Sequence, residues 1–476
     1  MANLFKSFMV VGIEKALYML IQFASAIILA RLLSPEDFGI VGITAIFTAL
    51  SSLLVDSGMG GSLVYHKDSD KKDFSTIFWF NLSIAAIAYI ILFFISGTIS
   101  RFYEIPILEP IIKISGLAIL FTSLGFTQLN KLTKELQFKK LALINVIAYA
   151  IATIAAIILA IMGLGVWVLV VQQLLHNSVK TILLFFYAKF WPSFYFSKKL
   201  LKKHFSFGCS LMFSSFLKTT YDNVYSFVMG KWMSLTAVGY FNQAKRVQDL
   251  PYQFTSTVLD QATFPIMVKI QDDDMFGITA RKILRFILVL FLPLLMIMSL
   301  CSNEIVILLL GEKWIEAAPI LTGLAFGCIA LLGEAINRNF IKAKGATKLI
   351  FKLELFKKTT AIILVIVAVR FGVTGLVITF IFNAFIAYMC NMWGTSSVSS
   401  YKYKQQIKDF IQILVLAVTP YIICQLASNY VQVGYIISFA IKTSLYLVIY
   451  ISILILIRNA EIRLIFSKIK QLKNKL

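Results

Sequence analysis

The stretch YFNQAKRVQDLP, residues 240–251, poses the question on which the fold depends. It carries Lys245, Arg246 and Asp249 close together, in a chain that is 59% hydrophobic and only 14% charged. Apolar runs of about twenty residues recur from end to end, which is the length that crosses roughly 30 Å of hydrocarbon as a helix. We therefore expect an all-α polytopic membrane protein, and the charged stretch is either a loop in water or a polar site within the membrane.

The apolar runs predict fourteen transmembrane helices. The first run passes the triplet Ala24-Ser25-Ala26, which resembles a signal-peptide cleavage site, but it continues to Leu33 and contains Glu14 and Lys15. We therefore interpret it as a retained first span. The predicted spans are 8–30, 38–57, 75–99, 108–128, 141–162, 165–187, 206–230, 236–267, 283–301, 316–337, 350–369, 373–394, 409–428 and 433–457.

The basic residues orient these spans. With a cytoplasmic N-terminus, 32 Lys and Arg residues fall in the inside segments and only five in the outside connectors. Cytoplasmic loops of membrane proteins carry such an excess of positive charge. We therefore predict that both termini are cytoplasmic.

This orientation bears on the charged stretch. The connectors at 189–205 and 269–285 are both strongly basic and therefore both inside. The chain must leave and return between them, so the span 236–267 carries Lys245 and Arg246 at membrane depth. A charge at that depth is costly unless it faces a wet cavity or a partner.

An internal repeat divides the chain. RLLSPEDFGI, from Arg31, and KWMSLTAVGY, from Lys231, are offset by 200 residues, and a second echo relates GVWVLV, from Gly165, to GVTGLV, from Gly372. We infer two six-helix lobes of like orientation followed by two further helices, with a substrate site between the lobes. The predicted parts are an N-terminal lobe at 1–187, a connector at 188–205, a C-terminal lobe at 206–395, two appended spans at 409–457 and a basic cytoplasmic tail at 458–476.

Three pairs of charges inside spans have i,i+4 spacing, which places both members on one helix face. They are Lys218 with Asp222, Lys245 with Asp249, and Glu334 with Arg338. Each is either a local ion pair or part of a polar cavity, and the spacing leaves both interpretations open. Arg246 adds a further cation to its span.

A cavity with surplus cations suits a phosphate- or pyrophosphate-bearing substrate, because guanidinium groups donate two hydrogen bonds to such oxygens. The predicted substrate-binding cations are Arg246, Lys245, Lys218, Arg338 and Lys15, and the acids that tune them or couple an ion are Asp222, Asp249, Glu334 and Glu14. The neighbouring Tyr221, Asn223, Asn242 and Gln243 either contact sugar hydroxyls or join helices.

Several classes of function are disfavoured. The net charge of +22 is spread over short connectors, where it favours lipid contacts over a nucleic-acid partner. The five cysteines and three histidines form no metal-ligand or disulfide pattern. There is no phosphate-binding loop of the G-x-x-x-x-G-K-[ST] type, so we expect no cofactor and no nucleotide hydrolysis, and any driving force comes from H⁺ or Na⁺ gradients, the membrane potential or the substrate gradient.

Two motifs resemble those of the polysaccharide transporter branch of the multidrug/oligosaccharidyl-lipid/polysaccharide exporter superfamily, the Wzx-like flippases. The first is ARLLSPEDFGI, residues 30–40, followed by Asp56-Ser57-Gly58. The second is VGYFNQAKRVQDLP, residues 238–251, followed by Phe264-Pro265 and Gln271-Asp272-Asp273. Arg246 matches a basic position of that branch, whereas Gln243 stands where the branch often has another arginine.

The resemblance implies a fold like that of the superfamily's multidrug exporters, with two lobes around a central cationic cavity. It implies movement of undecaprenyl-pyrophosphate-linked oligosaccharide across the inner membrane for O-antigen, capsule or exopolysaccharide synthesis, with glycan polymerase or assembly proteins as possible partners. Two alternatives stay open from the residues. A cation-coupled multidrug exporter would need an acidic or aromatic cavity, and a membrane glycan polymerase or ligase would need a sizeable outward loop.

Overall fold

The computed structural model describes residues 18–56, 59–66, 68–259, 263–428 and 433–457. Within these ranges the chain forms helices joined by turns, and no strand occurs. Ten of the described helical segments are long and apolar enough to cross a membrane, and Tyr18–Leu32 is a shorter apolar helix. The predicted all-α class is therefore confirmed.

The number of crossings stays a prediction. The predicted spans 206–230 and 236–267 fall on α8 (Lys198–Trp232) and α9 (Leu235–Val258), which are long but are not among the ten apolar segments. The helices are α2 (Pro35–Asp56), α3 (Met59–Tyr65), α4 (Lys71–Tyr103), α5 (Leu108–Lys134), α6 (Phe138–Ile161), α7 (Trp167–Ala188), α8, α9, α10 (Phe264–Val268), α11 (Asp273–Leu300), α12 (Ser302–Leu309), η2 (Glu312–Trp314), α13 (Ala317–Ala343), α14 (Thr347–Ala368), η3 (Val369–Phe371), α15 (Gly372–Val398), α16 (Tyr403–Ser428) and α17 (Tyr435–Leu456).

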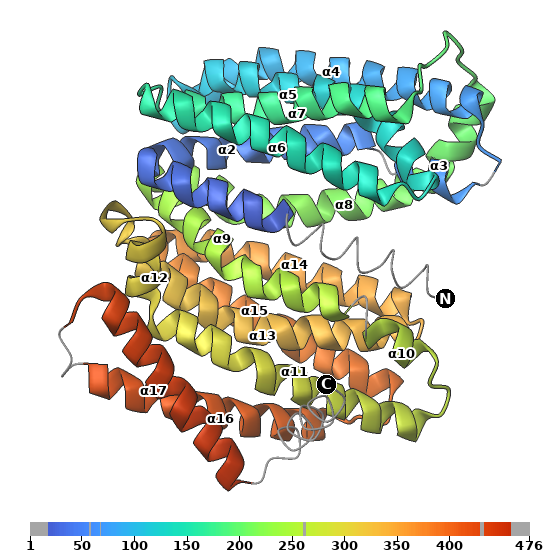
Figure 1. Cartoon of the computed structure of the whole chain (residues 1–476). Helices are drawn as coiled ribbons and strands as arrows, with labels where there is room; N and C mark the ends of the chain where they lie inside the picture. Colours follow the sequence, from blue (N-terminus) through green and yellow to red (C-terminus); the bar gives the residue numbers. More distant parts are fainter. Residues whose placement is uncertain (1–17, 57–58, 67, 260–262, 429–432, 458–476) are drawn as a thin grey trace, which may run out of the picture. The chain divides into compact units, whose positions relative to one another are not determined.

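The chain divides into two compact units, residues 1–239 and residues 240–476. In the first unit, α5 packs between α4 and α7, α6 packs on α7, and α2 packs against α5 (Figure 1). Helix α8 joins this unit through α2, α3 and α4. The boundary between the two units therefore lies after the end of α8, whereas the sequence predicts a boundary between the lobes at 188–205.

In the second unit, α13 is the central helix and packs most extensively against α15 and α11. Gly323, Gly327 and Gly333 form a stripe on α13, and the side chains of Val377, Phe380 and Tyr388 of α15 occupy the space that a larger residue would take. Small residues at such positions allow membrane helices to approach closely. Helices α16 and α17, the appended spans of the sequence prediction, pack against α11 and α12.

The two stretches related by the offset of 200 residues fold alike locally. Ser34 precedes α2 and Ser234 precedes α9. The amide of Asp37 donates to the Ser34 hydroxyl at 3.2 Å, and the amide of Ala237 donates to the Ser234 hydroxyl at 3.2 Å. Both serines therefore cap a helix start in the way that serine side chains stabilise exposed amides.

Candidate functional site

The charged stretch 240–251 is helical and belongs to α9. Lys245 Nζ lies 3.5 Å from Asp249 Oδ1, so the predicted i,i+4 pair forms, with both side chains about a third exposed. Arg246 is exposed beside this pair. Pro251 lies inside the helix and has no amide hydrogen, which leaves the carbonyl of Val247 without its usual intrahelical donor.

A buried charged network lies where α13, α14 and α15 meet. Lys357 Nζ donates to Glu334 Oε1 at 2.8 Å and to Glu354 Oε1 at 2.6 Å. The Asn391 side-chain amide donates to Glu334 Oε1 at 2.8 Å. Glu334 and Lys357 have side-chain exposures of only 6% and 8%, so the pair is withdrawn from water. We call Glu334, Arg338, Glu354, Lys357 and Asn391 the Glu334 network.

The predicted pair of Glu334 with Arg338 forms, and Glu334 has a second, closer cationic partner. Arg338 Nη1 lies 4.0 Å from Glu334 Oε1, and its side chain is 41% exposed. The short contact of Glu334 is with Lys357, which comes from the next helix. The local spacing therefore predicts the contact with Arg338, whereas the closer ionic partner of Glu334 is on α14. Arg338 forms the exposed end of the network.

Helix α9 reaches the network through Tyr252. The Tyr252 side chain hydrogen-bonds to Arg338. Asp249 and Lys245, one turn and two turns earlier on α9, lie near Cys328 of α13. The structure thus brings the predicted residues of α9 and α13 together within the second unit, along one face of α9.

Two glutamines on α9 are buried, Gln248 on the same face as Lys245 and Asp249 and Gln243 on another face. Gln243 and Gln248 are 2% and 0% exposed. The Gln248 side chain contacts the thiol of Cys328 on α13, and among the described residues Gln243 Nε2 has no hydrogen-bond partner. Buried amides in proteins are normally satisfied by protein groups or ordered water, so Gln243 Nε2 is a donor that is still available for a hydrogen bond.

The other predicted residues do not join this group. Asn223 on α8 donates its amide to the carbonyl of Thr219 at 2.8 Å, which is a contact within its own helix. Asn242 lies on α9, half-buried. The side chains of Lys218, Tyr221 and Asp222 and all of Glu14 and Lys15 lie outside the described part of the chain.

Sequence reasoning missed Lys357. It counted this lysine among the basic residues of a cytoplasmic connector, whereas the structure buries it between two glutamates. One signal was present, because Glu354 and Lys357 have i,i+3 spacing inside the predicted span 350–369.

Two further buried ion pairs fix the last two helices. Asp409 of α16 is fully buried and accepts from Arg281 at 2.7 Å and from Arg285 at 2.8 Å, both on α11. Lys442 of α17 donates to Glu304 of α12 at 2.5 Å. Because each pair joins an appended helix to the core of the unit, we interpret both as structural.

The apolar helices define a multi-pass membrane protein. The chain belongs to the family of polysaccharide biosynthesis proteins, which matches residues 28–319, more than half of its length. Both motifs, at 30–40 and 238–251, lie inside the matched region, and the resemblance inferred from them is confirmed.

Named proteins resemble the chain over most of its length. The lipopolysaccharide biosynthesis protein WzxC of Escherichia coli (strain K12) is 25% identical over 374 residues, covering 76% of this chain and 75% of that protein. The teichuronic acid biosynthesis protein TuaB of Bacillus subtilis (strain 168) is 24% identical over 335 residues, covering 70% and 69%.

Among solved structures, the lipid II flippase MurJ in an inward closed conformation has a TM-score of 0.74 and 17% identity, and the match covers 95% of this chain and 99% of that one. At this identity the likeness shows a shared fold.

Proposed function

We propose that the protein is a flippase, not an enzyme, which moves an undecaprenyl-pyrophosphate-linked oligosaccharide from the inner to the outer leaflet of the bacterial cytoplasmic membrane. The oligosaccharide serves O-antigen, capsule or exopolysaccharide synthesis, and transport proceeds by alternating access. The family, the names of two relatives and the fold shared with a lipid II flippase support this proposal.

The observation that carries the proposal is the charged face formed by α9 and α13. Lys245 and Arg338 have side chains 34% and 41% exposed, and Arg246 is exposed beside them. Ammonium and guanidinium groups at membrane depth need water or an anionic ligand, and pyrophosphate is an anion that arginine binds through two hydrogen bonds. We assign pyrophosphate contact to Arg246, Lys245 and Arg338, with Lys218 and Lys15 as further contributors.

The acidic residues have a separate role in this proposal. Glu334 is buried and accepts hydrogen bonds from Lys357 and Asn391, so it fixes the buried end of the Glu334 network. Arg338 lies at the exposed end of the network, where Glu334 and Tyr252 orient its side chain. A change in the protonation of Glu334 would release Arg338, which is how an H⁺ gradient would act on substrate binding. Asp249 restrains Lys245 through their ion pair, and we assign charge tuning or ion coupling to Asp222 and Glu14 as well.

A multidrug exporter is the second candidate that the fold class admits. Its cavity must receive cationic drugs, whereas the α9 and α13 face presents Lys245, Arg246 and Arg338. Like charges repel a cationic ligand, so the same residues that suit pyrophosphate disfavour this function. A strain that lacks the protein should become more sensitive to cationic drugs if the protein is a multidrug exporter, and should keep its sensitivity unchanged if the protein is a flippase.

The proposal is tested by the leaflet location of the lipid-linked glycan. Spheroplasts lacking the protein are probed with an impermeant lectin, and we expect the glycan to be reachable only when the protein is restored. Arg246→Ala should fail to restore it, and Arg370→Ala should succeed, because Arg370 is an exposed arginine in η3 outside the α9 and α13 face. Unchanged glycan exposure in the strain without the protein would refute the assignment.

A further inference from the structure

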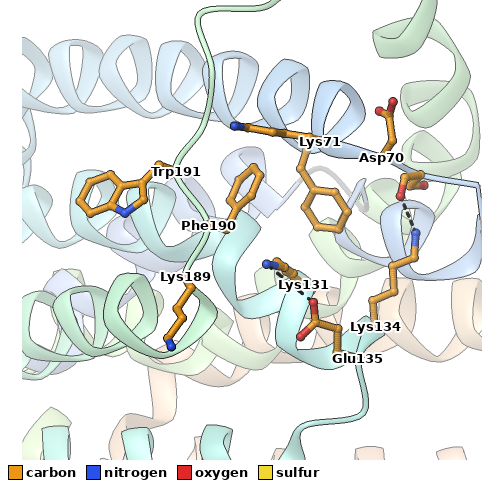
Figure 2. Close-up of a pocket in the computed structure, with 10 residues that line it drawn as sticks. Asp70, Lys71, Lys131, Lys134, Glu135, Lys189, Phe190 and Trp191 are labelled. Atoms are coloured by element: carbon orange, nitrogen blue, oxygen red, sulfur yellow. Dashed lines mark hydrogen bonds and ion pairs between the residues drawn. The ribbon is translucent and has the colours of Figure 1, made fainter.

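A pocket of about 580 Å³ lies in the first unit, at the ends of three apolar helices. It forms where α4 begins, where α5 ends and where the chain leaves α7. In the view of Figure 2, Phe190 lies between Lys71 and Lys131. The pocket is lined by Ser69, Asp70, Lys71, Phe74, Lys131, Lys134, Glu135, Lys189, Phe190 and Trp191. Because apolar spans begin and end here, the pocket belongs at the membrane surface.

The lining carries more positive than negative charge. Its four lysines face two carboxylates, Asp70 and Glu135. The Asp70 carboxylate is engaged as the N-cap of α4, where it accepts from the amide of Lys72 at 2.8 Å. Glu135 lies 3.7 Å from Lys131. Among the described residues, no carboxylate pairs with Lys71 or Lys189, so two cations are left for an anionic ligand.

Two of the lysines are held by the backbone. Lys131 Nζ donates to the carbonyl of Ala188 at 2.9 Å. Lys134 Nζ donates to the carbonyls of His66 at 3.0 Å and Ser69 at 2.9 Å. Because carbonyl groups do not neutralise these ammonium groups, they fix the positions of both charges without removing the attraction for an anion.

An aromatic segment, FWPSFYF at residues 190–196, forms the rim. Trp191 and Phe194 are 70% and 96% exposed. The segment is nevertheless anchored, because the Trp79 indole donates to the Ser193 carbonyl at 2.9 Å and the Phe194 ring stacks on Trp79. Exposed tryptophan and tyrosine side chains are enriched where a membrane meets water, at the level of the lipid headgroups.

We propose that this pocket binds the phosphate of a membrane lipid, with Lys71 and Lys189 contacting the phosphate oxygens and the rim of Trp191 and Phe194 lying against the upper acyl chains. Lysine binds phosphate as a point charge, and basic pockets at the ends of membrane helices select anionic headgroups. The proposal requires only that the chain is a membrane protein and stands apart from the flippase proposal. The lipid is either an anionic phospholipid or a polyprenyl pyrophosphate, since both present a phosphate at this depth.

The test uses Trp191 as a reporter. The full-length protein is placed in phosphatidylcholine nanodiscs, and phosphatidylglycerol brominated near the headgroup is added to quench nearby tryptophans. The signal of Trp191 is the part of the quenching that Trp191→Phe removes. Each lysine near the surface contributes about fivefold to anionic lipid binding, so we expect half-quenching at about 25-fold lower mole fraction than with brominated phosphatidylcholine.

Variants locate the site. Lys71→Gln/Lys189→Gln should abolish the preference for phosphatidylglycerol, and both lysines are exposed, so the variant is expected to fold. Lys139→Gln/Lys140→Gln is the matched control, because it removes two exposed lysines from the first turn of α6, outside the pocket, and should keep the preference. Equal quenching by both lipids, an unchanged preference in the pocket variant, or an equal loss in the control variant would each overturn the proposal.

Competition identifies the source of the phosphate. Unlabelled phosphatidylglycerol or undecaprenyl pyrophosphate is added, and the one that reverses the Trp191 quenching at the lower mole fraction is the preferred lipid; either result supports the site. Reversal by inorganic pyrophosphate in the buffer as efficiently as by either lipid would show a site for free anions and would overturn the lipid assignment.

Discussion

Gly39 of α2 packs against the first residue of α9, and Gly239 of α9 packs against the first residue of α2. A methyl group on Gly39 would overlap the carbonyl oxygen of Leu235, and a methyl group on Gly239 would overlap the carbonyl oxygen of Pro35. The two glycines are 200 residues apart, as are Pro35 and Leu235. The first turns of two helices therefore cross backbone to backbone, and each crossing point admits no side chain.

We predict that Gly39→Ala and Gly239→Ala each destabilise the protein by about 1–3 kcal/mol, the usual cost of forcing extra atoms into a packed contact. The overlap is with backbone carbonyls, which cannot move aside as the end of a side chain can. Thermal melting in detergent measures the loss. Gly434→Ala is the control, because no atom lies within 4 Å of its added methyl group, and equal melting of all three variants would contradict the prediction.

The buried pair of Glu334 and Lys357 predicts a strong effect on stability. Lys357→Met leaves the Glu334 carboxylate without its 2.8 Å cationic partner, and breaking a buried ion pair from one side costs about 3–5 kcal/mol. We expect the double variant Glu334→Gln/Lys357→Met to recover part of the loss, because the buried Glu334 charge is then gone and only the partly exposed Glu354 lacks its lysine. Equilibrium unfolding of the single and double variants measures the coupling.

Arg338→Gln is the comparison for these variants of Glu334 and Lys357. Arg338 lies 4.0 Å from Glu334 and is 41% exposed, so its removal should cost much less than the removal of Lys357. If Arg338→Gln and Lys357→Met were equally destabilising, the assignment of Lys357 as the main partner of Glu334 would fail.

The exposed cations should affect transport more than stability. We expect Arg246→Ala and Lys245→Ala to reduce glycan export at least tenfold at unchanged abundance, because each removes a charge-assisted contact to pyrophosphate worth about 1.5–3 kcal/mol. Arg246→Lys should retain part of the export rate, since lysine keeps the charge but cannot form the bidentate hydrogen bonds of arginine. Export at the parental rate in both alanine variants would remove these residues from the substrate path.

A buried histidine predicts a dependence of stability on pH. His204 is fully buried on α8, before the predicted span, with Nε2 2.9 Å from Asp73 Oδ1 and Nδ1 2.8 Å from Ser62 Oγ. Burial lowers the pKa of His204 below its ordinary value, and Lys203 and His66 act in the same direction, while Asp73 opposes them. The unfolded chain therefore binds a proton at higher pH than the folded chain does.

The sign of the effect follows. The contribution of His204 is fully present above the unfolded pKa of about 6.5 and declines as the pH falls below it. We expect the melting temperature to drop between pH 7.5 and pH 5.5, and His204→Gln to drop less over the same interval. Parallel melting curves for the two proteins would show that other groups cause the acid sensitivity.

Much of the fold follows from local patterns in the sequence. Apolar runs of span length predict helices, and the structure places helices at the described positions of these runs. The i,i+4 spacing of Lys245 and Asp249 predicts their contact, because helix geometry alone brings such residues together. The serines before α2 and α9 likewise cap helices through residues three positions away.

The partners that join different helices follow from tertiary packing alone. Lys357 meets Glu334 from another helix at 2.8 Å, and Arg281 meets Asp409 across 128 residues at 2.7 Å. No spacing rule links such residues, because their distance depends on how two helix surfaces pack. The sequence by itself therefore determined the membrane class, the helices and the charged segments. The tertiary structure decided which charges neutralise one another and which, as at Lys71 and Lys189, line a pocket without an acidic partner among the described residues.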